Sequence, residues 1–322
     1  NALISENSHR MEKKLWTENT GNEKITLYEA YNELDEARYL VRTIQMLHQG
    51  GDNYQDIAIL YRSNAQSRII EDQLLQMQIP YRIHGGLRFY DRAEIKDVLA
   101  YLRLMINRQD DYAFNRIINT PARGIGATTC TMLERYGQLH QCALWESVSR
   151  LLADPESPLK PRTRTALQGF CDLIVRLEAL IAAMPLNALC EQVMMHSGLQ
   201  SHFEKGNRAA NQDKLDNLYE FVNAASGFDD TQTDRAQQLA QFLTQVTLDQ
   251  THQDEKITGV QLMTMHAAKG LEFPFVMVVG LEEGTFPHQM TFDQPAQIEE
   301  ERRLCYVALT RAMKKLYLTY SK

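Results

Sequence analysis

The sequence carries alternating strand-like and helix-like patterns at both ends and helix-like patterns alone between them. Short apolar runs such as DIAILY (56–61), VQLMTM (260–265) and FVMVVGL (275–281) are typical of strands buried on both faces of a sheet. In the first part of the chain these runs are separated by amphipathic segments with apolar residues at helical spacing. Strands that alternate with helices predict parallel pairing and a layered α/β architecture.

The amino-terminal part contains three predicted strand–helix pairs. Asn32 has the residue type and position to cap the first helix, and Asp91 followed by Glu94 resembles a capping box at the start of the third. We therefore expect strands at 25–31, 56–61 and 79–86, a helix after Asn32 that includes 34–47, and helices at 67–78 and 91–107.

The middle of the chain, 108–257, is predicted to be helical, with exposed loops at 226–235 and 247–259. Strand and helix patterns then return at 260–265, 275–281, 297–315 and 316–320. Each end alone supplies too few strands to bury a sheet. The simplest architecture is therefore one α/β domain built from both chain ends and interrupted by an all-helical insertion. The alternative is an architecture of two small α/β domains separated by a helical domain.

Composition narrows the class of protein without giving a function. The 322 residues carry a formal net charge of -7, so contact with nucleic acid would have to come from local basic patches. Five scattered cysteines without CxxC spacing argue against a disulfide framework or a zinc site. No run of residues is long and apolar enough for a membrane span, and the chain begins without Met, which indicates a fragment.

The stretch MTMHAAKGLEFP (263–274) is a polar turn between two predicted strands. Ligands of open α/β sheets bind at loops off the carboxyl ends of strands, so chemistry is expected here. Gly270 would let the backbone approach a phosphate, and Glu272 could accept hydrogen bonds from a ribose. An ordinary solvated connection explains the same residues slightly better on physics alone. The phosphate-loop pattern Gly-x-x-x-x-Gly-Lys-Ser/Thr is absent from the sequence.

Two further stretches have polar residues or glycines at positions where they could contact a phosphate. In EEERRLCYVALTRAMKKLYL (299–318), Arg311 near a helix end could act as an arginine finger on a phosphoryl group, although a salt-bridged helix surface is the alternative. In TPARGIG (120–126), the glycines permit a tight turn before a helix that Thr128 or Thr129 could cap. A plain helix–turn–helix connection accounts for this turn equally well.

Several long stretches together resemble one family. TMHAAKGLEFP, GLEEGTFP and EEERRLCYVALTRA closely resemble motifs V and VI of superfamily 1 DNA helicases of the UvrD, Rep and PcrA type. AILYRSNAQSRIIEDQL, PYRIHGGLRFYDRAEIKDVLAYLRL and NTPARGIG resemble other segments of these helicases in the same order. The resemblance spans essentially the whole chain.

The resemblance implies a domain organisation. In this family two RecA-like motor domains, 1A and 2A, each carry an inserted helical domain, 1B or 2B. The chain is similar to 2A plus 2B: 1–97 and 258–322 would form the RecA-like parallel-sheet domain 2A, and 98–257 the helical domain 2B. The phosphate-binding loop and the residues that hold Mg²⁺ would precede residue 1. The resemblance therefore implies that this chain alone does not hydrolyse ATP.

The resemblance also implies site residues. Arg311 would be the catalytic finger that reaches the γ-phosphate of ATP, with Gly270 and Glu272 on the nucleotide side and Glu272 near the ribose. The remaining matches are to positions at or near DNA, the last five of them to a turn that contacts duplex: Arg62, Ser63, Asn64, Thr264, His266, Arg123, Gly124, Ile125, Gly126 and Thr128. Arg123 would add a phosphate contact there.

The function implied is that of an ATP-dependent DNA helicase that moves 3′ to 5′ on single-stranded DNA and unwinds duplex in DNA repair. Its partners would be single-stranded DNA, duplex junctions, the 1A and 1B domains of the same polypeptide, and repair proteins in the bacterial cytoplasm and nucleoid. ATP and Mg²⁺ would be held mainly by the preceding half. A motor half of a helicase-nuclease is one alternative. A non-catalytic DNA-binding or interaction module is another, which Arg311 and Glu272 disfavour.

Overall fold

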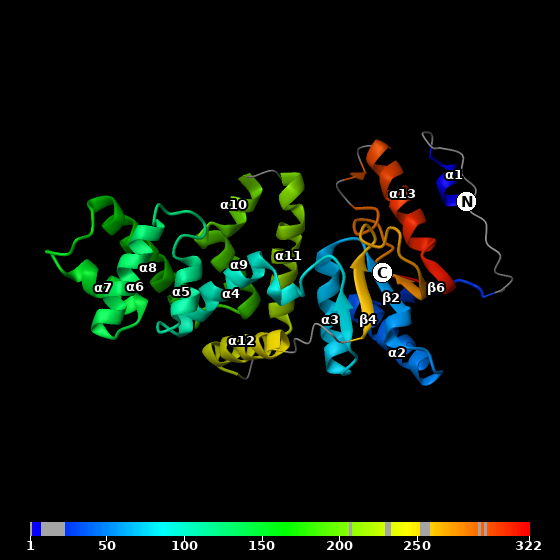
Figure 1. Ribbon diagram of the computed structural model, residues 1–322, viewed down its shortest axis with the longest axis horizontal. Coiled ribbons are helices and arrows are strands. Elements are labelled where there is room, and N and C mark those ends of the chain that lie inside the picture. The colour runs from blue at the N-terminus through cyan, green and yellow to red at the C-terminus, as the bar shows by residue number, and fades with distance from the viewer. Residues whose placement is uncertain are drawn as a thin grey trace. The chain divides into compact units, whose positions relative to one another are not determined.

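The computed structural model describes residues 2–7, 23–205, 208–228, 233–251, 258–288, 291–292 and 295–322. The chain divides into two compact units, the first formed by Asn1–Phe89 with Gln253–Lys322 and the second by Tyr90–His252 (Figure 1). The α/β prediction, with both chain ends contributing to one sheet around a helical insertion, is confirmed.

The junction between the units lies at a short 3₁₀ turn, Phe89–Asp91. Phe89 is held in the first unit, where its N–H donates to the buried Glu71 at 3.3 Å. Arg92 is held in the second, where it donates to Asn217 at 2.8 Å. The first boundary predicted from the sequence, after residue 97, would divide helix α4 (Ala93–Ile106), which lies wholly in the second unit.

The first unit is built on a six-stranded, all-parallel sheet in the order β1-β6-β5-β2-β4-β3. The two central strands, β5 and β2, pair directly, although one comes from each chain end. The strands are β1 (Thr26–Ala30), β2 (Ile57–Tyr61), β3 (Tyr81–Ile83), β4 (Val260–Thr264), β5 (Phe273–Val278) and β6 (Ala312–Ser321).

Both faces of this sheet are covered, which explains why its central strands are apolar throughout. Along β2, alternate residues point to opposite faces, and all five are buried. One face packs against helices α2 (Glu33–Gln49) and α3 (Ser67–Gln76), and the other against α13 (Pro295–Leu309) (Figure 1). The short helix α1 (Ala2–Ser5) packs beside α13.

The two predicted helix caps have different outcomes. The Asn32 cap is confirmed, because its side-chain oxygen accepts a hydrogen bond from the Asp35 N–H at 2.9 Å. The Asp91 cap is wrong: α4 begins after Arg92, and the Asp91 carboxylate pairs with Lys96 at 2.8 Å. Glu94 turns toward the helical core instead, where it accepts from Asn217 at 2.6 Å.

The second unit is helical throughout its described residues. The predicted loop from residue 247 is wrong as far as residue 251, because helix α12 (Arg235–Thr251) continues to Thr251. Residues 252–257 of that predicted loop and 229–232 of the other lie outside the described residues. Besides α4, the helices are α5 (Asp111–Ile117), α6 (Ala127–His140), α7 (Leu144–Ala153), α8 (Pro161–Ala179), α9 (Leu186–Ser197), α10 (Leu199–Lys205), α11 (Arg208–Ser226) and α12 (Arg235–Thr251).

The end of α13 differs from the prediction in a way that matters for the site. The sequence pattern predicted helix through residue 315, but α13 ends at Leu309 and β6 starts at Ala312. Ala312 pairs with Phe273 at the start of β5, so the sheet takes over where the helix was expected to continue. Thr310 and Arg311 therefore lie in the turn between helix and strand.

All five cysteine thiols are free, and Cys171 and Cys190 are buried. None of the described helices has the length and apolar character that a membrane crossing requires.

Candidate functional site

Arg311 lies in the turn between α13 and β6, and its guanidinium joins two parts of the first unit. Nε donates to the Val307 carbonyl and Nη1 to the Leu271 carbonyl, each at 3.0 Å, and Nη2 donates to the Thr310 hydroxyl at 3.0 Å. The Arg311 carbonyl in turn accepts from the Phe273 N–H at 3.0 Å. The structure thus brings Arg311 beside the turn that contains Gly270 and Glu272.

That turn presents an exposed glycine and an exposed carboxylate. Gly270 has φ of +86°, a conformation that L-residues rarely adopt, while a Cβ at this position would meet no atom within 4 Å. Glycine is therefore required by backbone conformation and not by lack of space. Among the described residues, Glu272 has no hydrogen-bond or ion-pair partner, so its carboxylate is available to a ligand.

The segment from Thr264 to Phe273 crosses from one edge of the sheet to the other. Thr264 ends β4 at the carboxyl edge, whereas Phe273 begins the parallel strand β5 at the amino edge. The expectation that this whole turn lies off the carboxyl ends of strands is therefore wrong for Gly270 and Glu272. A connection between parallel strands must return to the amino edge, and here it does so without a long helix.

At the carboxyl edge, the loops after β2, β3 and β4 lie together. A Cβ on Gly85 would be 3.7 Å from the Ala267 side chain, and one on Gly86 would be 3.9 Å from the Asn64 amide oxygen. The Thr264 hydroxyl accepts from the Ala267 N–H at 3.3 Å. Of the predicted residues, Ser63, Asn64 and His266 belong to these loops, and Thr264 is the last residue of β4. His266 is exposed. Gly85 and Gly86 fall within the strand predicted for 79–86, but β3 ends at Ile83 and the two glycines lie in the loop that follows it.

Arg62, the first residue after β2, is engaged inside the first unit. Its Nε lies 3.0 Å from both carboxylate oxygens of Glu301, and its Nη2 lies 2.8 Å from one of them. Glu301 lies on α13 and is 6% exposed. This two-point pairing means that Arg62 cannot contact DNA with its whole guanidinium.

The turn 120–126 in the second unit is held from inside by Asn119 and Arg123. The Asn119 side-chain oxygen accepts from the Arg123 N–H at 2.7 Å and from the Ile125 N–H at 3.2 Å. Ile125 is 1% exposed, whereas Gly124 and Gly126 on either side of it are exposed. Gly124 has φ of +76°, so glycine is required there for the turn.

The Arg123 side chain turns toward the helical core. Nη1 donates to the carbonyls of Ile117, Thr120 and Pro121 at 3.0–3.1 Å, and Nη2 donates to the Ser197 carbonyl at 2.9 Å. Nη2 also donates to the Tyr101 hydroxyl. Burial of this hydroxyl raises the pKa of Tyr101 to about 12. The prediction that Arg123 adds a phosphate contact does not fit this inward orientation.

The start of α6 completes the exposed part of this turn. The cap residue is Gly126, without a side-chain cap, so the predicted capping by Thr128 or Thr129 is wrong. Thr128 is exposed in the first helical turn. The first N–H groups of a helix lack intrahelical acceptors, so exposed N–H groups at Ala127 and Thr128 can receive an anion such as a phosphate.

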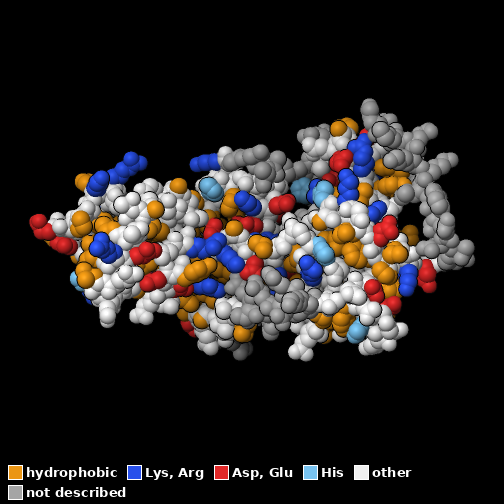
Figure 2. Space-filling model, viewed as in Figure 1, with side chains coloured by type: hydrophobic (Ala, Val, Ile, Leu, Met, Phe, Trp, Pro, Cys, Tyr) orange, Lys and Arg blue, Asp and Glu red, His pale blue; other side chains and the backbone are white. Residues whose placement is uncertain are grey.

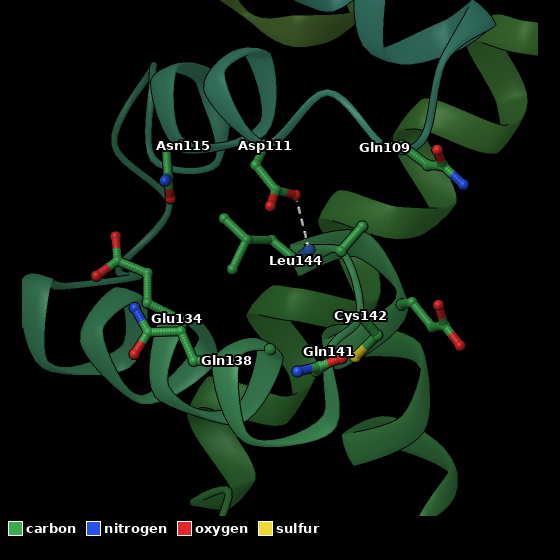
Figure 3. A pocket seen from close by; sticks show the side chains of 11 residues that line it. Gln109, Asp111, Asn115, Glu134, Gln138, Gln141, Cys142 and Leu144 are labelled. Atoms are coloured by element: carbon green, nitrogen blue, oxygen red, sulfur yellow. Dashed lines mark hydrogen bonds between the residues drawn. The ribbon is translucent and has the colours of Figure 1, made fainter.

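A separate polar depression of about 570 Å³ lies among α5, α6 and α7 (Figure 3). Asp111, Glu134 and Glu146 line it, and Asp111 accepts a hydrogen bond from the Leu144 N–H at 2.8 Å. None of the residues predicted to bind nucleotide or DNA lines this depression. Its carboxylates make it unsuited to a phosphate-bearing ligand.

Charges of both signs are intermixed over the face in view in Figure 2. This distribution agrees with the net charge of -7 and leaves contact with an anionic ligand to individual side chains and N–H groups. Within the described residues, no three His, Cys, Asp or Glu side chains gather in a way that could hold a metal ion.

Comparison with known proteins gives one consistent result. A family model described as the UvrD-like helicase C-terminal domain matches residues 1–154 and 175–322. The whole chain aligns with DNA helicase II of Escherichia coli (strain K12), at 47% identity, and with DNA helicase II of Haemophilus influenzae, at 45%. It is 39% identical to the ATP-dependent DNA helicase PcrA of Staphylococcus aureus. The chain spans 44–45% of the length of these relatives.

Proposed function

Because the chain belongs to the family of UvrD-like helicase C-terminal domains, we propose that it is the carboxyl-terminal half of an ATP-dependent DNA helicase. Its sheet unit acts as motor domain 2A and its helical unit as domain 2B. The complete protein moves 3′ to 5′ on single-stranded DNA and unwinds duplex during DNA repair in the bacterial cytoplasm and nucleoid.

The observation that carries this proposal is the placement of Arg311 against the Gly270–Glu272 turn. A guanidinium and an exposed carboxylate at one edge of the sheet suit the two ends of a nucleotide, its terminal phosphate and its ribose. Among the described residues, the acceptors of Arg311 are two carbonyls and a hydroxyl, which are neutral, so its positive charge is not neutralised by these contacts. A phosphate can therefore replace them without breaking an ion pair.

ATP bound with Mg²⁺ supplies the phosphoryl group to be transferred to water. This chain fits the outer side of such a nucleotide, because Arg311, in the turn after α13, lies beside the exposed turn that contains Gly270 and Glu272. Its described residues do not supply an acidic cluster for the metal, and its sequence contains no phosphate-binding loop. We assign both to a 1A domain elsewhere in a longer polypeptide.

The DNA side is assigned to the opposite edge of the sheet and to the helical unit. Ser63, Asn64, Thr264 and His266 supply polar groups at the carboxyl edge, where a single-stranded backbone would lie. The 124–128 turn supplies exposed backbone N–H groups for a duplex phosphate, a contact that positions the duplex without reading its sequence.

The proposal is tested by strand displacement with a longer polypeptide that contains this chain. Duplexes with a 3′ single-stranded tail should be unwound in the presence of ATP and Mg²⁺, and those with a 5′ tail should not. Residues 1–322 alone should bind single-stranded DNA but give no DNA-stimulated ATP hydrolysis. Unwinding from the 5′ tail would refute the polarity, and hydrolysis by residues 1–322 would refute the division of the active site.

A further inference from the structure

The pairing of Arg62 with Glu301 joins the loop after β2 to helix α13, across 239 positions of sequence. One guanidinium edge, Nε and Nη2, faces the carboxylate, with three contacts of 2.8–3.0 Å. Glu301 also accepts from the His288 N–H at 3.4 Å. The Arg62 N–H and the Ser63 N–H both donate to the Gln66 side-chain oxygen at 2.9 Å, so the backbone of the loop is fixed as well.

This arrangement leaves part of the Arg62 guanidinium for another ligand. Within the described residues, Arg62 Nη1 has no hydrogen-bond acceptor, and the side chain retains 21% of its exposure. The Glu301 side chain is only 8% exposed, so the carboxylate is the buried member of the pair and the guanidinium is the member nearer solvent. Because the guanidinium is planar, a carboxylate that holds Nε and Nη2 also fixes the direction of Nη1 before a ligand binds.

We propose that Glu301 is a positioning residue that orients Arg62 for a phosphate of single-stranded DNA, and that this pair couples DNA contact to α13 and so to Arg311. The inference rests on the proposed function. The physical path is short: Glu301 and Val307 lie on α13, and the Val307 carbonyl accepts a hydrogen bond from Arg311. A shift of Arg62 on binding DNA therefore moves the helix that holds the nucleotide-side arginine.

The alternative is an ion pair that serves stability alone. Buried charges do require partners, and removal of Arg62 would leave the Glu301 carboxylate buried and unpaired. A stability role predicts a lower melting temperature with unchanged affinity for DNA in the folded protein. The coupling role predicts a change in DNA affinity and in DNA stimulation of ATP hydrolysis that depends on Arg62 being present.

The test is a double-mutant cycle in the longer polypeptide with E301Q, R62A and E301Q/R62A. Glutamine keeps the size of Glu301 but loses its charge. Affinity for an oligo-dT single strand and the ratio of ATP turnover with and without that strand are measured at a temperature where all variants are folded. E300Q is the matched control, because Glu300 lies on the same helix, pairs with Arg303 at 2.8 Å and is 68% exposed.

E301Q should weaken oligo-dT binding by about two- to tenfold, the range expected when a long side chain must be ordered on binding. It should lower the DNA-stimulation ratio, and it should have no further effect on either quantity in the R62A background. E300Q should behave as the wild type. Equal binding and stimulation by E301Q and wild type, or an E301Q effect that persists in R62A, would overturn the inference. Absence of DNA-stimulated turnover in the wild type would instead refute the proposed function.

Discussion

Arg311 donates a hydrogen bond from Nη1 to the carbonyl of Leu271 at 3.0 Å, across 40 positions of sequence. The reciprocal contact, from the Phe273 N–H to the Arg311 carbonyl, fixes the starts of β5 and β6 to each other. The side chain predicted to reach a nucleotide is therefore hydrogen-bonded to the turn predicted to lie beside that nucleotide. Displacement of the guanidinium toward a ligand would release the Leu271 carbonyl.

R311A in the longer polypeptide should abolish most ATP turnover and leave single-strand binding intact. An arginine finger contributes about 10³–10⁵ in kcat, so we expect a loss of at least about a hundredfold. The measurement is steady-state hydrolysis at saturating DNA, with affinity for oligo-dT measured in parallel. R303A is the control, since Arg303 makes partly exposed ion pairs with Glu299 and Glu300 on its own helix. Turnover by R311A close to that of R303A would remove the finger assignment.

G270A should destabilise the sheet unit, because Ala must adopt φ of +86° there. The expected cost is about 1–2 kcal/mol, since an L-residue in the left-handed region loses that amount. The comparison is G169A: Gly169 lies in the interior of α8 with open space around its Cβ position, and alanine should stabilise that helix by about 0.5–1 kcal/mol. Urea unfolding of the two variants should give shifts of opposite sign. A G270A protein as stable as the wild type would contradict the conformational requirement.

The sequence carries enough information for the layers of this fold and much less for its side-chain contacts. Burial on both faces forces apolar residues at every position of β2, so that strand can be recognised locally. The pairing of Arg62 with Glu301 leaves no local mark, because its members are far apart and each resembles an ordinary surface residue. The inward orientation of Arg123 is equally hidden, since its acceptors are backbone carbonyls, which every residue possesses.

The failed expectation at 263–274 has a topological cause. A local pattern shows that a polar turn separates two strands, but not whether the next strand is parallel. The parallel pairing of β5 with β2 places Gly270 and Glu272 at the amino edge, away from Thr264 and His266. The residues predicted for the nucleotide side and those predicted for the DNA side therefore lie at opposite ends of the strands.

G124A, and a G124A/G126A variant, should weaken binding to duplex–single-strand junctions more than binding to single strands. Ala at residue 124 must adopt φ of +76°, which distorts the exposed turn, and the N–H groups that follow would be misplaced for a phosphate. The measurement is the ratio of the two Kd values at one salt concentration. G169A again serves as a control remote from the turn. Equal losses on junction and single strand would refute a duplex contact at 124–128.

The buried carboxyl group of Glu36 should make stability depend on pH. Burial raises the pKa of Glu36 above its ordinary value of 4.5, against the opposing effect of the hydrogen bond from the Gly280 N–H. Since the folded pKa lies above the unfolded one, the contribution of this group is fully present below pH 4.5 and is lost as pH rises through the folded pKa. Glutamine retains an acceptor for Gly280 and does not titrate. E36Q should therefore gain stability relative to the wild type as pH rises from 4.5 toward neutrality, measured by urea unfolding; a constant difference would contradict the raised pKa.

R123A should destabilise the helical unit, because Arg123 donates to four backbone carbonyls of buried or partly buried residues. Its removal leaves the carbonyls of Ile117, Thr120, Pro121 and Ser197 without these donors. Unsatisfied buried groups cost about 1–3 kcal/mol each where water cannot replace the lost partner, so we expect a loss of about 2–4 kcal/mol in the free energy of unfolding. R123K keeps the charge but lacks the planar fork, and it should recover only part of that loss.

The same pair of variants separates this role from a phosphate contact. A direct contact would predict that R123K binds junction DNA nearly as well as the wild type, and that R123A lowers the salt dependence of binding by about one unit of slope, with little change in stability. An inward, structural Arg123 predicts the reverse: stability falls in both variants, and junction affinity falls with it as the 124–128 turn loses its support. Unfolding and salt titration on the same preparations decide between the two outcomes.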